Sequence, residues 1–335
     1  MNIRRSFFIC LPMGFVLAAA AYFGLFLLQL GVPTARSTWL HSVIEKKITA
    51  AAAIRKPKLL IVAGSSALYG ISAEEIERQT GFPAYNFGTN AALGCEYLLH
   101  LTRKVSRPGD TVLLAFEYET YLLGGRTGET ADEFFISYVL GSDAEFVRSL
   151  SAGDQFRLAL MTPSDRLWDG VRAVFRKPVP DAATQSSIRE ILHDIDAYGD
   201  QTCAVPEKRP AQSPARTMLS GIPAVGFPPS PPGFRAIREF CAWAKANDVR
   251  VLATFPNLCH RPEYDAPAAK KIPVQFREFY GSLGVPVLGE LSESMLPEVQ
   301  MFDTNYHPLR SAAIARTQRL LVHLAPHLRA KPVER

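Results

Sequence analysis

One long uncharged run near the amino terminus most constrains how this chain can fold. Residues Phe7 to Leu28 contain no charged side chain, and Arg4 and Arg5 precede them. An α-helix rises about 1.5 Å per residue, so about 20 apolar residues cross the hydrocarbon core of a bilayer. The run is long enough, and the two arginines favour a cytoplasmic amino terminus. We therefore expect a transmembrane anchor over residues 7–30, with the remainder of the chain outside the cytoplasm.

A cleaved signal peptide is the alternative interpretation of the same run. Ala18 to Ala21 supply the small residues that a cleavage site needs. Apolar character nevertheless continues from Tyr22 to Leu28, so the run exceeds the usual signal-peptide core of about 7–15 residues. The length of the run favours an uncleaved, single-pass anchor, with residues 1–6 in the cytoplasm.

Short apolar segments recur after residue 56 and predict buried strands at 58–63, 83–87, 111–116, 250–255 and 286–288. The first is apolar on both faces, which is typical of a central strand in a parallel sheet. After it, Ser72 with Glu75 three positions later predicts the start of a helix, and Gly81 predicts its end. Strand–helix alternation with short loops predicts an α/β domain with a doubly wound parallel sheet over residues 57–330.

Two regions lie outside this alternation. Residues 31–56 are expected to contain a juxtamembrane helix, and residues 118–230 a large insertion. The insertion has predicted helical stretches at 132–140, 144–150 and 187–198 and a Pro-rich stretch at 206–232. We expect it to serve partly as a lid over the sheet and partly as mobile loop. A last helix is predicted from about 309 to 324, with Pro326 just beyond it.

Ligand sites in open α/β sheets lie beyond the carboxyl ends of the strands, and four polar clusters fall there. They occupy residues 64–70, 86–90, 117–119 and 303–308. Because parallel strands end at the same edge of a sheet, we expect these clusters to meet.

The first cluster resembles the opening motif of the SGNH (GDSL-like) hydrolase superfamily. That motif reads Gly-Asp-Ser with a glycine four residues after the serine, and Gly64, Ser66 and Gly70 match it. The resemblance implies that Ser66 is the nucleophile and that Ser65 stands where the family has aspartate. The sequence is similar in particular to the membrane-anchored members of this superfamily that are found with bacterial exopolysaccharide and cell-wall acylation systems.

The last cluster resembles the closing motif of the same superfamily. The family has Asp-x-x-His before the final helix, whereas here Asp303 precedes His307 by four positions. The resemblance implies that His307 accepts the serine proton and that Asp303 orients the imidazole. The alternative orienting group is Asn305 or an acidic residue other than Asp303. The resemblance covers residues 57–120 and 233–328 and excludes the insertion.

The chemistry of such a site needs these residue types. A serine hydroxyl is a weak nucleophile until an imidazole accepts its proton, and a carboxylate fixes the imidazole tautomer. By resemblance, Gly88 is a backbone donor to the oxyanion. The family's Gly-x-Asn-Asp block is absent, and Glu117 begins the segment in its place. Asn90 is the candidate replacement donor, and Ser65 and Glu117 are further candidates for oxyanion or substrate binding.

Other features narrow the function class. The net charge is +5, but the basic residues are scattered along the chain. Nucleic-acid-binding proteins usually concentrate basic residues on one element, so we expect no nucleic-acid partner. The sequence has no CxxC pair, no GxGxxG motif and no His/Asp cluster at metal-ligand spacing, so we expect neither a metal nor another cofactor. Four cysteines outside the apolar run either pair in an oxidising compartment or are buried thiols: Cys95, Cys203, Cys241 and Cys259.

The sequence therefore predicts an extracytoplasmic, periplasmic serine esterase or O-acyltransferase that acts on acetyl or other acyl groups of an exported polysaccharide. Hydrolysis and transfer share an acyl-serine intermediate, so the residues leave both open. The expected partners are the acylated polysaccharide, the lipid bilayer and other membrane proteins of polysaccharide synthesis. The alternative is an inactive SGNH-like module that serves as a scaffold or glycan-binding subunit of a secretion complex.

Overall fold

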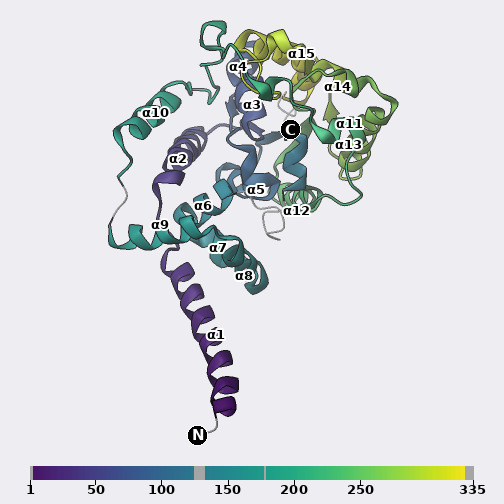
Figure 1. The fold of residues 1–335 in the computed structure, drawn as a ribbon. Coiled ribbons are helices and arrows are strands. Elements are labelled where there is room, and N and C mark those ends of the chain that lie inside the picture. Colours follow the sequence, from purple (N-terminus) through teal and green to yellow (C-terminus); the bar gives the residue numbers. More distant parts are fainter. Residues whose placement is uncertain (1–2, 124–132, 177–178, 329–335) are drawn as a thin grey trace. The chain divides into compact units, whose positions relative to one another are not determined.

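The computed structural model describes residues 3–123, 133–176 and 179–328 of a mixed α/β chain (Figure 1). The chain divides into two compact units. Residues 1–41 and 126–185 form the first, which we call the anchor unit, and residues 42–125 and 186–335 form the second, the sheet unit. The predicted insertion 118–230 is therefore not one body, because its central part belongs with the amino-terminal segment.

The anchor unit begins with the single helix α1 (Ile3–Leu28). Its stretch Cys10–Leu28 is long and apolar enough to cross a membrane, and only 6% of it is buried within the protein. The predicted apolar helix is thus present, and it fits a single-pass membrane protein.

Four helices of the insertion complete the anchor unit: α6 (Glu133–Ser142), α7 (Ala144–Ser149), α8 (Ala152–Met161) and α9 (Ser164–Phe175). The sequence predicted α6 and α7 but not α8 and α9. The α9 helix packs on the end of α1 and the residues after it, where the buried Arg166 donates hydrogen bonds to the Gln29 side chain and, at 3.2 Å, to the Val32 carbonyl. A Cβ atom at Gly170 would lie 2.1 Å from Oε1 of Gln29, so this approach requires glycine.

The sheet unit is built on five parallel strands in the order β2-β1-β3-β4-β6. Their bounds are β1 (Leu59–Val62), β2 (Ala84–Asn86), β3 (Thr111–Leu114), β4 (Arg250–Thr254) and β6 (Val287–Leu288). Leu59 pairs with Ala84 on one side and Thr111 on the other, and all four residues of β1 are buried. The α/β class, the parallel sheet and its five strands are as the sequence predicts. A second parallel pair, β5 (Leu258–Cys259) with β7 (Met295–Leu296), was not predicted.

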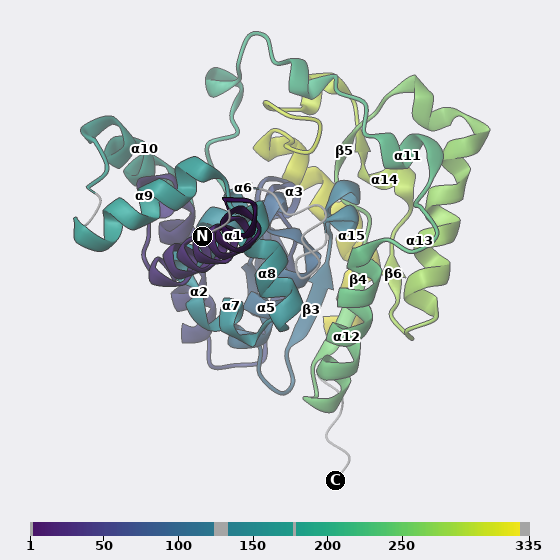
Figure 2. The ribbon, with the colours of Figure 1, turned by 60° about the horizontal axis from the view of Figure 1, so that its bottom comes forward.

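The longer helices of the sheet unit are α4 (Ala73–Thr80), α5 (Gly94–Val105), α12 (Pro232–Ala246), α13 (Lys271–Gly281) and α15 (Arg310–Leu328). In this unit α5 contacts α12, and α15 contacts α4 and the short α3 (Ser65–Gly70). Two helices, α2 (Thr38–Ala53) and α10 (Ala182–His193), span the boundaries between the units. Figure 2 shows the strands and their helices from a second direction.

One helix begins and ends as predicted, and two others differ from their predicted bounds. Ser72 accepts a hydrogen bond from the Glu75 amide at 3.2 Å and Gly81 has a φ of 68°, so α4 begins and ends as predicted. The helix predicted at 187–198 instead runs from Ala182 to His193, and it starts early because the Asp181 carboxylate accepts the Thr184 amide at 2.7 Å. The last helix continues through Pro326, which lies in its final turn, where a missing amide donor breaks few hydrogen bonds.

A buried ion pair ties β1 to β3 and predicts an asymmetric response to mutation. Lys58 Nζ lies 2.7 Å from Asp110 Oδ2, and the Asp110 carboxylate also accepts the amides of Lys58 and Arg107. We expect Asp110→Ala to lower the free energy of unfolding by about 3–5 kcal/mol, because it leaves a buried ammonium unpaired. Lys58→Met should cost less, since Asp110 keeps both amide donors. Urea unfolding of the full chain in detergent micelles measures both, and equal costs would contradict the argument.

Candidate functional site

The turn after β1 and the loop after β2 meet at the carboxyl edge of the sheet. A Cβ atom at Gly64 would lie 2.5 Å from the backbone of Ala91, and one at Gly88 would lie 2.6 Å from the Leu68 amide nitrogen. Both glycines are therefore required by close backbone approach. The expected proximity of these two polar clusters is present in the structure.

Glu117, which follows β3, closes the turn from the other side. Its carboxylate accepts hydrogen bonds from the amides of Ser66 at 2.6 Å and Gly64 at 3.1 Å, and the side chain is buried. Burial raises the pKa of Glu117, while these amide hydrogen bonds act in the opposite direction. Both carboxylate oxygens are thus used as acceptors within the protein, where the sequence suggested a role in oxyanion or substrate binding.

The two adjacent serines have different environments. Ser66 is fully buried, its hydroxyl donates to the Ala115 carbonyl at 3.2 Å, and its carbonyl accepts from Asn257 Nδ2 at 2.7 Å. Ser65 begins α3 and is partly exposed, and its hydroxyl has no hydrogen-bond partner among the described residues. The structure therefore presents Ser65, rather than the expected Ser66, to solvent.

Asp303 and His307 are joined as the sequence suggested, despite their spacing of four. His307 Nδ1 lies 2.8 Å from Asp303 Oδ1, so Asp303 rather than Asn305 orients the ring. The imidazole stacks on the Tyr69 ring, with centroids 4.1 Å apart and planes 9° apart. In the part of the chain that the structure describes, Nε2 of His307 makes no hydrogen bond, and neither serine bonds to this histidine directly.

The stacking partner shows which face of α3 the histidine lies against. Tyr69 is four residues after Ser65, so the two side chains lie on the same helical face, one turn apart. The residue four positions after Ser66 is Gly70, where a Cβ atom would lie 1.5 Å from Asn257 Nδ2. His307 therefore lies on the Ser65 face of the helix, and Asn257 fills the Ser66 face.

The Pro-rich segment, residues 206–232, packs onto the loop that carries His307. The Ser213 hydroxyl donates to the Asp303 carbonyl. Glu119 accepts from the Tyr306 hydroxyl at 2.5 Å and from the Ser220 hydroxyl, so the segment after β3 also fixes this loop. Residues 213–220 thus help to position Asp303 and His307, as part of a lid would.

The expected oxyanion donors differ in availability. The Gly88 amide donates to Asn86 Oδ1 at 3.0 Å and is therefore already used. Asn90 Oδ1 accepts the Ala92 amide at 2.9 Å, which leaves its Nδ2 group without a partner in the described residues. Of these two donors, Asn90 is the one that remains free for a ligand.

Two supporting residues gave no signal in the sequence. Asp200 accepts hydrogen bonds from the Ser72 hydroxyl, the Ala73 amide and Asn86 Nδ2, and so links the start of α4 to the end of β2. Lys47 on α2 is fully buried and donates from Nζ to the carbonyls of Asn86 at 2.7 Å and Gly199 at 2.8 Å. Both depend on contacts between distant segments, which no local pattern predicts.

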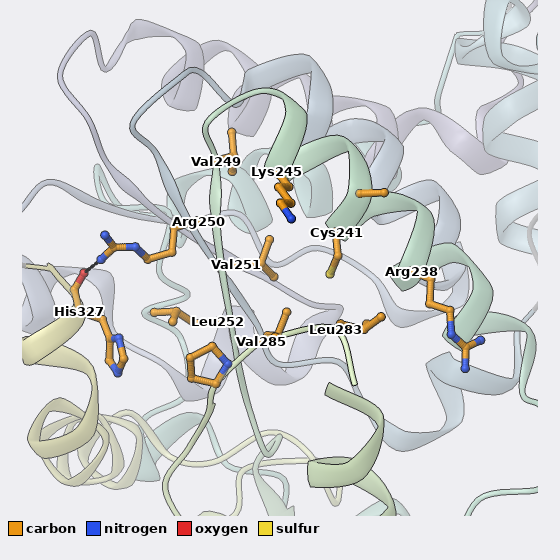
Figure 3. A pocket seen from close by; sticks show the side chains of 13 residues that line it. Arg238, Cys241, Lys245, Val249, Arg250, Val251, Leu252, Leu283, Val285 and His327 are labelled. Carbon is orange, nitrogen blue, oxygen red and sulfur yellow. Dashed lines mark hydrogen bonds between the residues drawn. The ribbon is translucent and has the colours of Figure 1, made fainter. Parts of the chain in front are cut away.

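Larger cavities lie at the opposite edge of the sheet. Cavities of about 560 and 670 Å³ share Lys245, Arg250 and His327, at the amino end of β4. Figure 3 shows the smaller one, in which basic side chains surround the aliphatic Val251 and Val285. The described residues that line it include no carboxylate, so it lacks the acid that orients a catalytic histidine.

The cysteines are all free thiols, so the alternative of disulfide pairing is not realised. Burial raises the pKa of Cys203 and raises that of Cys241 to about 11, which keeps both protonated at neutral pH. Within the described ranges no three His, Cys, Asp or Glu side chains gather as metal ligands do.

Lys47 predicts a pH dependence of stability. Burial lowers the pKa of Lys47 from 10.5 to about 7. Below pH 7 the lysine is charged in both states, and its burial opposes folding. Between about pH 7 and 10.5 only the unfolded chain retains the proton, so stability should rise by up to about 1.4 kcal/mol per pH unit.

We expect Lys47→Met to remove this component of the slope. The neighbouring Lys46→Met is the matched control, because Lys46 donates to the carbonyls of Leu192 and Ile195 and is the smallest of the causes that shift the pKa of Lys47, so this variant should keep most of the slope. Urea unfolding at pH 7, 8 and 9 measures the difference. An identical slope in wild type and Lys47→Met would show that Lys47 does not titrate in this range.

Comparison with known proteins assigns no family to the chain. No protein-family model matches the sequence, and no curated protein matches it. The function proposed below therefore rests on the site residues, their geometry and the motif resemblance.

Proposed function

We propose that the chain is a membrane-anchored serine esterase or O-acyltransferase of SGNH type. The observation that carries this proposal is the His307 imidazole, which Asp303 holds through Nδ1 while Nε2 stays unbonded. An imidazole fixed in this way accepts a proton from a nucleophilic hydroxyl through Nε2. The strand order β2-β1-β3-β4-β6 supports the doubly wound, flavodoxin-like sheet that such enzymes share.

We assign the nucleophile to Ser65 in preference to Ser66. Ser65 is partly exposed, has an unbonded hydroxyl and shares a helical face with the tyrosine on which His307 stacks. Ser66 is buried and its hydroxyl is already a donor to a carbonyl. This assignment moves the nucleophile by one residue relative to the position that the family motif implies.

The proposed reaction forms an acyl-serine. His307 accepts the Ser65 proton as the hydroxyl oxygen attacks the acyl carbonyl, and then returns that proton to the leaving alcohol. Asn90 Nδ2 donates to the developing oxyanion. Water or a second sugar hydroxyl then attacks the acyl-serine, which gives hydrolysis or transfer.

An exported, acylated polysaccharide is the proposed substrate, and the sheet unit is placed outside the cytoplasm. Arg4 and Arg5 before the apolar helix support this orientation, and the resemblance to anchored polysaccharide-acylation proteins supports the substrate class. The other membrane proteins of such a system are proposed partners.

A non-catalytic scaffold or glycan-binding module is the second candidate function. The specific observation in its favour is that the amides of Gly64, Ser66 and Gly88 are all bonded within the protein. An oxyanion site would then depend mainly on Asn90, with fewer donors than the family motif provides.

Fluorophosphonate labelling of the purified full chain separates these functions. We expect covalent labelling of the wild type, loss of labelling in Ser65→Ala and His307→Ala, and retention in Ser66→Ala. The Ser66 change is the matched control, because it removes one hydroxyl–carbonyl bond worth about 1 kcal/mol. The reverse serine pattern would return the nucleophile to Ser66, and an unlabelled wild type would favour the scaffold.

Asp303→Asn tests how the histidine is oriented. The asparagine amide would donate to Nδ1 and favour the wrong tautomer, so we expect kcat on a model acetyl ester to fall by about 10³–10⁴-fold with little change in KM. Asn305→Ala serves as the control and should retain most activity. A larger loss in the Asn305 variant would assign the orienting role to that residue.

A further inference from the structure

The exposed aromatic side chains of the protein are concentrated in the anchor unit. Outside α1, each described phenylalanine or tryptophan that is more than 40% exposed lies between residues 133 and 175. These are Phe134 (43%), Phe156 (50%), Trp168 (55%) and Phe175 (82%). Leu160, one turn after Phe156 on α8, is also exposed. Such a cluster on a protein surface usually marks a contact with a partner or a membrane.

The α8 helix contacts α1 within the apolar stretch itself. The Phe156 ring stacks on the Phe23 ring with centroids 5.2 Å apart, and the Tyr22 hydroxyl donates to the Ala159 carbonyl. Tyr22 precedes the end of the stretch at Leu28 by six residues, or about 9 Å along the helix axis. If α1 spans the bilayer, α8 therefore lies beside lipid below the membrane surface.

The α9 helix presents its aromatic residues away from the protein. Trp168 and Phe175 are seven residues apart, which places them on one helical face after two turns. Arg166 and Gly170 lie on the packed face against Gln29, nearly opposite. Figure 1 shows α8 and α9 on either side of the carboxyl-terminal end of α1.

The acidic residues of these helices are engaged within the protein. Asp165 and Asp169 are paired with Arg36 at 2.6 and 3.5 Å. Asp169 also lies 3.7 Å from Arg172, and Asp154 accepts a hydrogen bond from the Ser151 hydroxyl. The exposed basic residues Arg157, Arg172 and Arg176 lie on the same two helices as the aromatic residues or directly after them. Arginine reaches lipid phosphates while its stem covers apolar surface, and tryptophan is enriched at the membrane–water interface.

We propose that α8 and α9 form a second membrane contact, in which Phe156, Leu160, Trp168 and Phe175 enter the leaflet that surrounds the carboxyl-terminal end of α1. Lipid is the occupant because this surface is continuous with the lipid-facing side of α1, through Phe23 and Phe156. The proposal rests on α1 spanning the bilayer and is independent of the catalytic assignment. It gives the insertion a role in holding the chain at the membrane.

The native tryptophans supply the test. The chain contains Trp39, Trp168 and Trp243, so Trp39→Phe with Trp243→Phe leaves only Trp168. The matched control, Trp39→Phe with Trp168→Phe, leaves only Trp243 on α12 of the sheet unit. Both full-length variants are reconstituted into phosphatidylcholine–phosphatidylglycerol vesicles whose acyl chains carry bromine near the glycerol end.

We expect brominated lipid to lower Trp168 fluorescence roughly twofold relative to unbrominated lipid and to leave Trp243 unchanged, since quenching requires contact with acyl chains at interfacial depth. Carbonate washing must leave the chain in the membrane, and release would remove the basis of the proposal. In retained protein, absence of bromine quenching overturns the proposal. Acrylamide then distinguishes a tryptophan exposed to water, which it quenches, from one covered by a protein partner.

Discussion

The candidate site depends on a single buried carboxylate at the end of β3. The first amides of a helix have no partner within the helix, and each buried, unbonded amide costs about 1–3 kcal/mol. Glu117 satisfies two of them at the start of α3, those of Gly64 and Ser66. The end of one strand thereby fixes the turn that follows its neighbour.

Much of the fold was predictable because its signals are local. A strand buried on both faces requires an uninterrupted apolar run, and β1, β3 and β4 each have one. The α4 cap is also contained within a few residues, since Ser72 bonds to the amide three positions later. The Asp303–His307 hydrogen bond is local too, because the two residues lie in one short loop.

The rest depends on residues far apart in the chain. Ser66 turns inward because its hydroxyl reaches Ala115 and its carbonyl is held by Asn257, 191 positions away. A motif match locates the nucleophile to within one residue, at Ser65 or Ser66, but it does not distinguish the environments of the two serines. The helices α8 and α9 were missed for a related reason. On α9 the buried positions do recur at helical spacing, but they include Arg166 and Gly170, which are buried by contact with the distant Gln29 and do not read as an apolar stripe in the sequence.

Folding uses some polar groups of the site and leaves others free. Ser66, Glu117, Asn86 and the Gly88 amide are all bonded within the protein, and each bond stabilises the turn or the neighbouring loop. Within the described chain, the Ser65 hydroxyl, Nε2 of His307 and Nδ2 of Asn90 make no such bond, so the fold does not account for their presence. In the proposed reaction these three groups serve as the nucleophile, the base and the oxyanion donor. Their chemistry is complementary, which is the reason to assign them to a substrate instead of to stability.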